Sequence, residues 1–447
     1  MKTIFVLFLI IIYAHSSSPM HAGETANEFH SAAAKLLSVL HDGDTLWNHV
    51  AEFVDNYPRR LSGSQNLEQG IDWLIARYKA EGWDVRTQPV MVPVWVRGNE
   101  WCKLVAGGPV HSMPMVGLGG SVNTGGKPIK APVLVVSSFN DLDAKAALAQ
   151  GRIVVWNVPF TKYSETVSYR YNGPSAAAKY GAVGSLVRSI GPYGMQTPHT
   201  GGMGYKDSIA KIPAAAITME DAMLLQRLQD RGQTPVVEMY MEAHTLPDAP
   251  SRNIMFEIRG SEKPDEVVVM GGHIDCWDVC TGAMDDASGA MVAYRALHAI
   301  RRAGLKPKRT LRVCFWTNEE NGLRGGKAYE EQTRNENHFA AMEIDGGTFQ
   351  PLGFSGTMPE PLLSKVKDVL TLLAPVGATR WLEGGGGADT SPLAEQRKTP
   401  VLELDVDITK YFWYHHTEAD TPDKLNPDEL NKCVYAVAVV AYALSSM

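Results

Sequence analysis

The C-terminal half of the chain alternates between short apolar runs and amphipathic stretches. Four apolar runs have the length of a strand, and they are EVVVMGG (266–272), TLRVCFWT (310–317), AAMEID (340–345) and PVLELDV (400–406). A stretch with helical spacing of its apolar residues begins at Ala287, between the first two runs. Apolar strands that alternate with helices are typical of a sheet covered on both faces. The pattern therefore predicts an α/β fold with a mixed, largely parallel sheet.

One helix is clearly marked in the N-terminal half. In the segment SGSQNLEQGIDWLIARYKAEG (62–82), Ser64 is a plausible N-cap and Gly82 a stop signal. The apolar face of this predicted helix consists of Leu67, Ile71, Leu74 and Tyr78.

The middle of the chain differs from its flanks in amino-acid composition. Glycine and proline become frequent from about Gly107, and strand-like runs follow at residues 133–138 and 152–158. This composition ends near the linker HTLPDAPSRN (244–253), which is rich in proline and aspartate. The predicted parts are a main domain from residues 45–107 and 247–447 and an inserted α+β domain from residues 108–246.

The first 20 residues have the pattern of a signal peptide. Lys2 precedes ten apolar residues at 4–13, and small and polar residues follow. The alternative is a membrane anchor, but ten residues fall short of the roughly 20 that span a bilayer. We therefore expect a secreted, extracellular protein without a membrane span, and residues 21–44 form a candidate propeptide.

Charge and cysteine content exclude two other classes of protein. The 447 residues include 42 Lys and Arg against 49 Asp and Glu, for a net charge of −7, and no basic run stands out. Nucleic acid is therefore not an expected partner. Five cysteines cannot all pair with one another, so the chain is not a disulfide scaffold, although Cys276 and Cys280 could bridge a short loop.

Acidic and imidazole side chains stand where the predicted strands end. His273 and Asp275 follow the first apolar run, Glu319 and Glu320 the second, and Asp345 closes the third. In open α/β sheets, ligands bind at the carboxyl ends of the strands. A single such residue is more often a cap or a solvated group, but this many at the ends of one sheet favour a shared site. Imidazole and carboxylate are good ligands of zinc.

The spacing of these residues suggests which of them bind the metal and which act as its orienting group or as a general base. His273 and Asp275 point to the same side of an extended chain, so one can bind the metal while the other orients it. The adjacent Glu319 and Glu320 point differently, which suits one ligand and one general base. Asp285, at the start of a helix, suits a carboxylate that two ions share.

Two neighbouring acids and two histidines complete the candidate cluster. We expect Asp286 to cap the helix that begins at Ala287, and we assign no role to Asp278. The motif YHHTEADT near the C-terminus adds His415 and His416.

Four motifs in this order carry a family resemblance: GGHIDCWDVCTGAMDDASG, WTNEENGLRGG, MEIDGGT and YHHTEADT. Together they resemble the two-zinc exopeptidases of the aminopeptidase and glutamate carboxypeptidase type. The resemblance covers nearly all of the chain after residue 20. It implies a zinc-exopeptidase catalytic domain, and it implies that the insert at 108–246 is a protease-associated domain. It also makes the lysosome an alternative destination.

The resemblance assigns roles by motif position. It implies that His273 and Asp345 bind one zinc ion, that Glu320 and His416 bind the other, and that Asp285 bridges them. It further implies that Glu319 is the general base and that Asp275 orients His273. Some relatives have a tyrosine at the position of His415, and relatives often have serine and glycine at the positions of Cys276 and Cys280.

The expected activity is hydrolysis of short unblocked peptides, above all dipeptides, by a homodimer in which the insert narrows the cleft. The glycine-rich segment EGGGGADTSPL (383–393), which contains Asp389, is expected to form part of the wall. The net acidity gives no reason to expect a preference for acidic residues. Two alternatives stay open: a receptor-like ectodomain without activity, and a glutaminyl cyclase, which uses one zinc ion on a similar domain.

Overall fold

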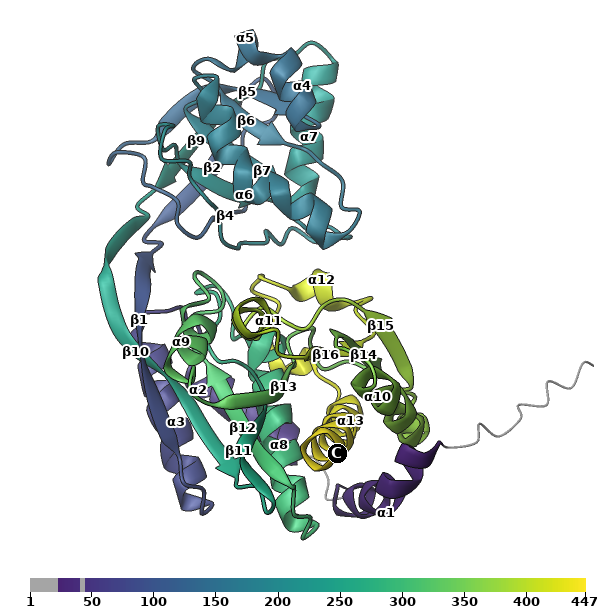
Figure 1. Ribbon diagram of the computed structural model, residues 1–447. Coiled ribbons are helices and arrows are strands. Elements are labelled where there is room, and N and C mark those ends of the chain that lie inside the picture. Colours follow the sequence, from purple (N-terminus) through teal and green to yellow (C-terminus); the bar gives the residue numbers. More distant parts are fainter. Residues whose placement is uncertain (1–22, 41–44) are drawn as a thin grey trace, which may run out of the picture.

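The computed structural model of the protein describes residues 23–40 and 45–447. Figure 1 shows a larger body and a smaller body, which we define as residues 97–243, joined by a long two-stranded ribbon. The predicted signal peptide at residues 1–20 lies outside the described residues. In the described part of the chain, no helix combines the length and the apolarity needed to cross a membrane.

The larger body contains an eight-stranded mixed sheet in the order β1-β10-β12-β11-β13-β16-β14-β15. The strands are β1 Arg86–Val96, β10 His244–Ile258, β11 Lys263–His273, β12 Arg309–Trp316, β13 Asn337–Glu343, β14 Pro351–Thr357, β15 Arg380–Glu383 and β16 Val401–Val406. The central strands β12, β11, β13 and β16 run parallel, and β10 and β14 pair with this group antiparallel. The four apolar runs of the sequence form the four central strands, which confirms the predicted α/β fold.

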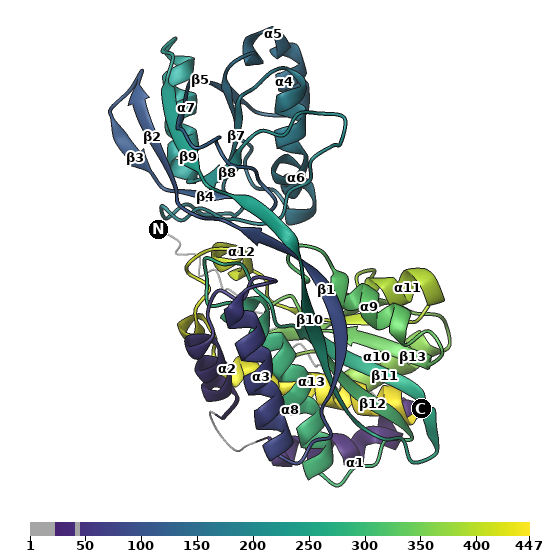
Figure 2. The ribbon, with the colours of Figure 1, turned by 90° about the vertical axis from the view of Figure 1, so that its left-hand side faces the viewer.

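Helices cover both faces of this sheet, as Figure 2 shows. The helices of the larger body are α1 Glu24–Val39, α2 Thr45–Asn56, α3 Gln65–Ala80, α8 Ser288–Arg302, α9 Arg324–Gln332, α10 Leu362–Leu370, α11 Ser391–Arg397, α12 Tyr411–Tyr414 and α13 Pro427–Ser446, with short turns η1 Ala283–Ala287, η2 Thr371–Val376 and η3 Pro422–Lys424. Helices α8 and α13 pack against β11 and β12 on one face. On the other face, Tyr329 of α9 and Leu393 of α11 join Val267 and Trp316 in a separate apolar cluster.

The predicted N-terminal helix is present as α3. The Ser64 side chain accepts a hydrogen bond from the Leu67 N–H, which is the N-cap geometry expected from the sequence. All four residues of the predicted apolar face are buried: Leu67, Ile71, Leu74 and Tyr78.

Helix α1 lies within the candidate propeptide at residues 21–44. Its Phe29 and Leu36 are buried in the main apolar core. At its N-terminus, the Asp368 carboxylate accepts hydrogen bonds from the Gly23 and Ala26 N–H groups, at 2.8 and 2.9 Å. Removal of this segment stays a prediction, and it would expose apolar side chains of the larger body.

The smaller body is built on a second sheet in the order β3-β2-β9-β5-β6-β7-β8-β4. Its elements are β2 Glu100–Ala106, β3 His111–Met113, β4 Met115–Gly117, β5 Ile129–Val136, α4 Phe139–Ala144, α5 Ala146–Ala149, β6 Ile153–Trp156, α6 Tyr163–Lys179, β7 Gly184–Arg188, β8 Ala214–Ile217, α7 Met219–Asp230 and β9 Val236–Met241. Strand β2 lies before residue 108, so the second sheet begins upstream of the segment that is rich in glycine and proline. The domain boundaries at 107/108 and 246/247 stay a prediction.

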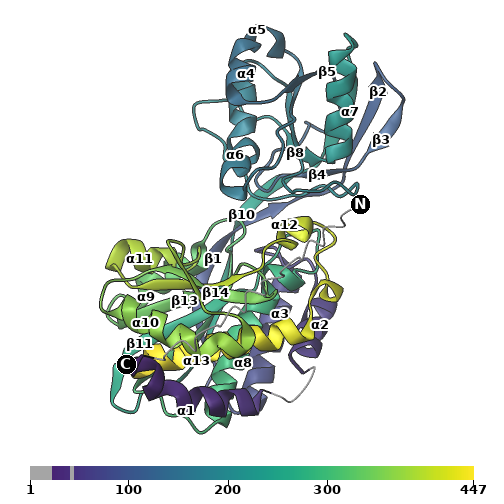
Figure 3. The same ribbon diagram turned by 90° about the vertical axis from the view of Figure 1, so that its right-hand side faces the viewer.

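The two bodies are held together by a ribbon and by side chains. Strands β1 and β10 pair antiparallel along the ribbon that joins the bodies, which Figure 3 shows from the opposite side to Figure 2. Arg97, just after β1, donates two hydrogen bonds to the Asp278 carboxylate, with N···O distances of 2.9 and 2.5 Å. Asp278, to which the sequence assigned no role, therefore ties the loop after β11 to the start of the smaller body.

The cysteines make no disulfide. All five are free and buried. The bridge that the sequence allowed between Cys276 and Cys280 is therefore absent.

Candidate metal centre

Polar side chains from three neighbouring strands meet at the carboxyl edge of the first sheet. His273 is the last residue of β11, Glu319 and Glu320 follow β12, and Asp345 follows β13. Strand β11 lies between β12 and β13 and runs parallel to both, so the three carboxyl ends lie side by side. This juxtaposition was predicted from the sequence.

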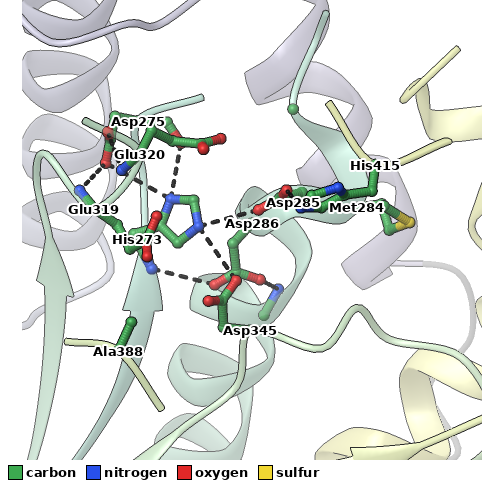
Figure 4. Close-up of polar contacts among 12 residues, drawn as sticks. His273, Asp275, Met284, Asp285, Asp286, Glu319, Glu320, Asp345, Ala388 and His415 are labelled. Atoms are coloured by element: carbon green, nitrogen blue, oxygen red, sulfur yellow. Dashed lines mark hydrogen bonds and ion pairs between the residues drawn. The ribbon is translucent and has the colours of Figure 1, made fainter. Parts of the chain in front are cut away.

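One group of candidate ligands surrounds His273, as Figure 4 shows. The His273 Nε2 atom lies 3.1 Å from Asp285 Oδ1 and 3.2 Å from Asp345 Oδ1. Asp285 reaches this point from η1, in the turn between β11 and α8. The three side chains offer an imidazole nitrogen and two carboxylate oxygens close enough to hold one metal ion.

A second group faces the other oxygen of Asp285. The His416 Nε2 atom lies 3.4 Å from Asp285 Oδ2 and 3.0 Å from Glu320 Oε2. His416 has a φ of 60°, which is uncommon outside glycine. Its carbonyl oxygen accepts a hydrogen bond from the Thr200 N–H of the smaller body at 3.0 Å, which supports this conformation.

His415 also lies at the centre. Its Nε2 atom is 3.6 Å from Asp285 Oδ2, and its ring stacks on that of His416 with centroids 3.6 Å apart. Burial lowers the pKa of His415 well below its usual value, and the charge of His416 lowers it further. The His415 ring contacts one candidate ligand carboxylate, whereas His416 contacts two.

Asp275 holds the turn that carries both glutamates. Its carboxylate accepts hydrogen bonds from the Glu319 N–H at 3.0 Å and from the Glu320 N–H at 3.3 Å. The His273 Nδ1 atom lies 3.0 Å from the Asp275 backbone carbonyl oxygen and 3.6 Å from the carboxylate. Asp275 thus orients His273 mainly through its carbonyl group, and its carboxylate positions the turn, which the sequence did not predict.

Glu319 differs from its neighbours in having no ion-pair partner in the described part of the chain. Burial raises the pKa of its carboxyl group well above the usual range, and the charge of His273 lowers it again in part. The carboxylates of Asp345 and Glu320 raise this pKa further. Burial and its charged neighbours thus set the proton affinity of Glu319, which pairs with no cationic side chain in the described ranges.

Several supporting residues were missed from the sequence. Asp420 accepts hydrogen bonds from the Met284 N–H at 2.7 Å and the Asp285 N–H at 3.2 Å, which fixes the backbone of the central carboxylate. Arg60 is buried and donates to the carbonyl oxygens of Ile274, Thr281 and Gly282 in the loop after β11, and to that of Tyr57 after α2. Asp420 could have been found from the sequence, because it lies in the YHHTEADT motif.

Asp286 acts as the sequence predicted and does more. Its Oδ1 atom accepts from the Gly289 N–H in the first turn of α8, at 3.2 Å. Its Oδ2 atom accepts from the His273 N–H at 3.1 Å, so it also ties the end of β11 to α8. The peptide bond between Asp285 and Asp286 is cis.

The glycine-rich segment lies behind the rim. Glu343 accepts hydrogen bonds from the N–H groups of Ala388, Asp389 and Thr390, at 2.8–3.1 Å. The Asp389 carboxylate is buried and receives no hydrogen bond. Burial raises the pKa of Asp389 well above the usual range, and the charge of Glu319 raises it further.

The residues present fit zinc. Asp285 Oδ2 and Asp345 Oδ1 are buried and accept no hydrogen bond, although ring nitrogens lie 3.2–3.4 Å away. Buried carboxylates of this kind are costly unless a cation offsets their charge. Zinc binds imidazole nitrogen and carboxylate oxygen, and both groups offer that combination.

A cavity of about 410 Å³ opens on these side chains. Its walls come from both bodies: the larger body contributes the rim and the residues around α12, and the smaller body contributes α6 and Gly202. Small-molecule sites typically measure about 300–1,000 Å³, so the space suits a short ligand.

Comparison with known proteins supports one family. The sequence profile of Peptidase family M28 matches residues 253–441. Carboxypeptidase Q of Xenopus laevis is 41% identical over 404 residues, which cover 90% of this chain and 86% of the relative. The human carboxypeptidase Q is 40% identical over 90% of this chain and 85% of its own length.

Solved structures agree with this result. A peptidase M28 precursor from Shewanella amazonensis SB2B superposes with a TM-score of 0.90 at 31% identity, over 94% of this chain and 98% of the other. An aminopeptidase from Aneurinibacillus sp. strain AM-1 shares the fold, with a TM-score of 0.66 at 17% identity over 93% and 96% of the two chains. The chain belongs to peptidase family M28 and, within it, to the carboxypeptidase Q group.

Proposed function

We propose that this metallopeptidase is a two-zinc exopeptidase that hydrolyses short unblocked peptides, with dipeptides as its main substrates. The observation that carries the proposal is the position of Asp285, whose Oδ1 faces His273 at 3.1 Å and whose Oδ2 faces His416 at 3.4 Å. A carboxylate with one oxygen toward each group is suited to bridge two ions.

The ligand assignment follows from the two groups. His273 and Asp345 would hold one zinc ion, Glu320 and His416 the other, and Asp285 both. His416 is preferred to His415 because it contacts the carboxylates of both Asp285 and Glu320. The relatives named carboxypeptidase Q support an exopeptidase, and a neighbour in fold described as a zinc aminopeptidase agrees with the metal.

The remaining side chains complete the mechanism. Zinc, when bound, supplies a Lewis acid that lowers the pKa of a water molecule and polarises the scissile carbonyl group. Glu319 takes the proton of the attacking water and passes it to the leaving amine. Asp275 keeps Glu319 in place by accepting its N–H, and it keeps the Glu320 backbone in place in the same way.

Neither alternative from the sequence gains support. A receptor-like ectodomain would be expected to have lost ligands or the base, whereas this chain keeps the full set. A glutaminyl cyclase with one zinc ion would not need both groups around Asp285. We also propose that the protein is secreted, with the lysosome as the alternative destination, and that it is a homodimer.

The test is a panel of free dipeptides, N-acetylated dipeptides and a denatured protein. We expect rapid release of free amino acids from the free dipeptides, because the cavity is small and its walls come from both bodies. Blocked dipeptides and internal bonds of the denatured protein should be cleaved slowly. Amino-acid analysis and mass spectrometry detect the products. Fast cleavage of blocked peptides or of internal bonds would reject the dipeptidase assignment and indicate a peptidase of broader specificity.

A further inference from the structure

The cavity wall carries two charged side chains that the proposed mechanism does not use. Apart from the candidate ligands, Glu319 and the histidines, the charged residues that line it are Arg170 and Glu403. They have opposite charge and come from different bodies: Arg170 from α6 of the smaller body, and Glu403 from β16 of the larger one. Within the described ranges, neither forms an ion pair.

Arg170 is a buried guanidinium without a counter-ion. Its side chain donates to the carbonyl oxygens of Thr200 and Gly202, at 3.1 and 3.2 Å, and to the Tyr163 hydroxyl at 2.9 Å. All three partners are neutral, and they use three of the five N–H groups that a guanidinium offers. Positive charge and donors therefore remain for a ligand. An anion with two oxygens, such as a carboxylate, matches this fork.

Glu403 is a half-buried carboxylate without a cation. Burial and, to a smaller extent, the nearby charge of Asp345 raise its pKa to about 7. Two glycines flank its oxygens: a Cβ atom at Gly346 would lie 3.8 Å from Oε1, and one at Gly385 would lie 3.7 Å from Oε2. No side chain of these two neighbours covers the carboxylate, so a cationic group can approach it.

The two residues stand beside different halves of the candidate metal centre. The Thr200 carbonyl oxygen that accepts from Arg170 also lies 3.3 Å from His416 Nδ1, so Arg170 adjoins the His416 group. Glu403 adjoins Gly346, which follows Asp345 of the other group. Along the cavity, a positive charge thus lies next to one group and a negative charge next to the other.

We propose that Glu403 and Arg170 bind the two charged ends of a free dipeptide, with the α-ammonium on Glu403 and the α-carboxylate on Arg170. The proposal rests on the dipeptidase function and explains how the enzyme selects peptides with two free ends. A zwitterion with one peptide bond supplies the charge that each wall lacks, and its scissile bond faces the rim of Asp285 and Glu319. A peptide blocked at one end can satisfy only one of the two residues.

The experiment tests each variant with a substrate that lacks the charged group that the substituted residue is proposed to bind. Ala-Ala, N-acetyl-Ala-Ala and Ala-Ala amide are compared by kcat/KM in the zinc-loaded full-length enzyme. Where a blocked peptide is turned over too slowly, its inhibition constant against Ala-Ala is used instead. For Glu403→Gln, the preference for the free over the N-acetylated peptide should fall roughly 10- to 100-fold, the usual worth of a hydrogen bond to a charged group. Its preference for the free peptide over the amide should stay unchanged.

Arg170→Gln should show the opposite selectivity. It should lose the preference for the free carboxylate over the amide and keep the preference for the free amine, and Arg170→Lys should restore part of the loss. Ratios within one variant are insensitive to a change in the folded fraction. Asp405→Asn is the matched control, because Asp405 lies two residues along β16 and binds Arg380 at 2.6 Å instead of facing the cavity. It should leave both ratios unchanged.

Three results would overturn the proposal while the wild type still cleaves dipeptides. Unchanged ratios in both variants would mean that neither side chain contacts an end of the substrate. Equal loss of both ratios in each variant would indicate a general structural role. Lys-Ala is added as a fourth substrate for Glu403→Gln, and a loss confined to Lys-Ala, with Ala-Ala unaffected, would mean that Glu403 binds a side-chain cation. A wild type that cleaves all three peptides equally well would instead reject the proposed function itself.

Discussion

Glu319→Gln should lower kcat by roughly 10²–10⁴-fold, the usual worth of a general acid–base catalyst, and should leave the zinc content unchanged. Glutamine keeps the shape of the side chain but cannot take a proton. No ion pair of Glu319 is lost in the variant, because none exists in the described part of the chain. The measurement is steady-state hydrolysis of a free dipeptide, with zinc determined by atomic emission on the same sample.

Glu320→Gln is the matched control for this prediction. Glu320 lies next to Glu319 in the chain, and its Oε2 atom is 3.0 Å from His416 Nε2. We expect this variant to lose zinc as well as activity. If Glu319→Gln lost zinc and Glu320→Gln retained it, the roles of the two residues would be reversed.

Asp285→Ala should remove more zinc than the loss of any other single ligand. Each terminal ligand serves one group, whereas Asp285 has an oxygen 3.1 Å from His273 Nε2 and another 3.4 Å from His416 Nε2. Activity on dipeptides should fall to the background. The comparison is zinc per chain in Asp285→Ala, His273→Ala and His416→Ala after dialysis against one fixed concentration of free zinc.

The fold itself should survive in Asp285→Ala. Asp420 holds the backbone N–H groups of Met284 and Asp285, and alanine keeps both. Circular dichroism and thermal unfolding check this point. A variant that is folded and retains as much zinc as His273→Ala would show that Asp285 is not a shared ligand.

The parts of the fold that could be predicted from the sequence are those set by local pattern. The apolar run at 266–272 becomes β11, and His273 closes it, because a buried strand needs consecutive apolar residues and its end faces the ligand edge. Helix α3 and its Ser64 cap follow from spacing and from one hydroxyl group. The convergence of His273, Glu320 and Asp345 follows from the parallel order of three strands.

Contacts between distant segments could not be predicted in this way. The Asp420 carboxylate accepts a hydrogen bond from the Asp285 N–H, and the Arg60 guanidinium donates to carbonyl oxygens of the loop after β11. The sequence around Asp420 or Arg60 does not indicate which distant segment each contacts. In the sequence, Asp278 is one of several acidic residues in the loop after β11, and its ion pair with Arg97 becomes evident only in the structure. The same holds for Glu403, which looks like a polar residue in a strand and lies on the wall of the cavity.

The zinc content of the fully active wild-type protein tests the central claim most directly. The enzyme is loaded with zinc, freed of excess metal, and measured for zinc per chain and for dipeptide hydrolysis in the same sample. Activity should follow zinc up to two ions per chain and should vanish on chelation. Full activity with one zinc ion per chain, or with none, would contradict the two-zinc mechanism built around Asp285.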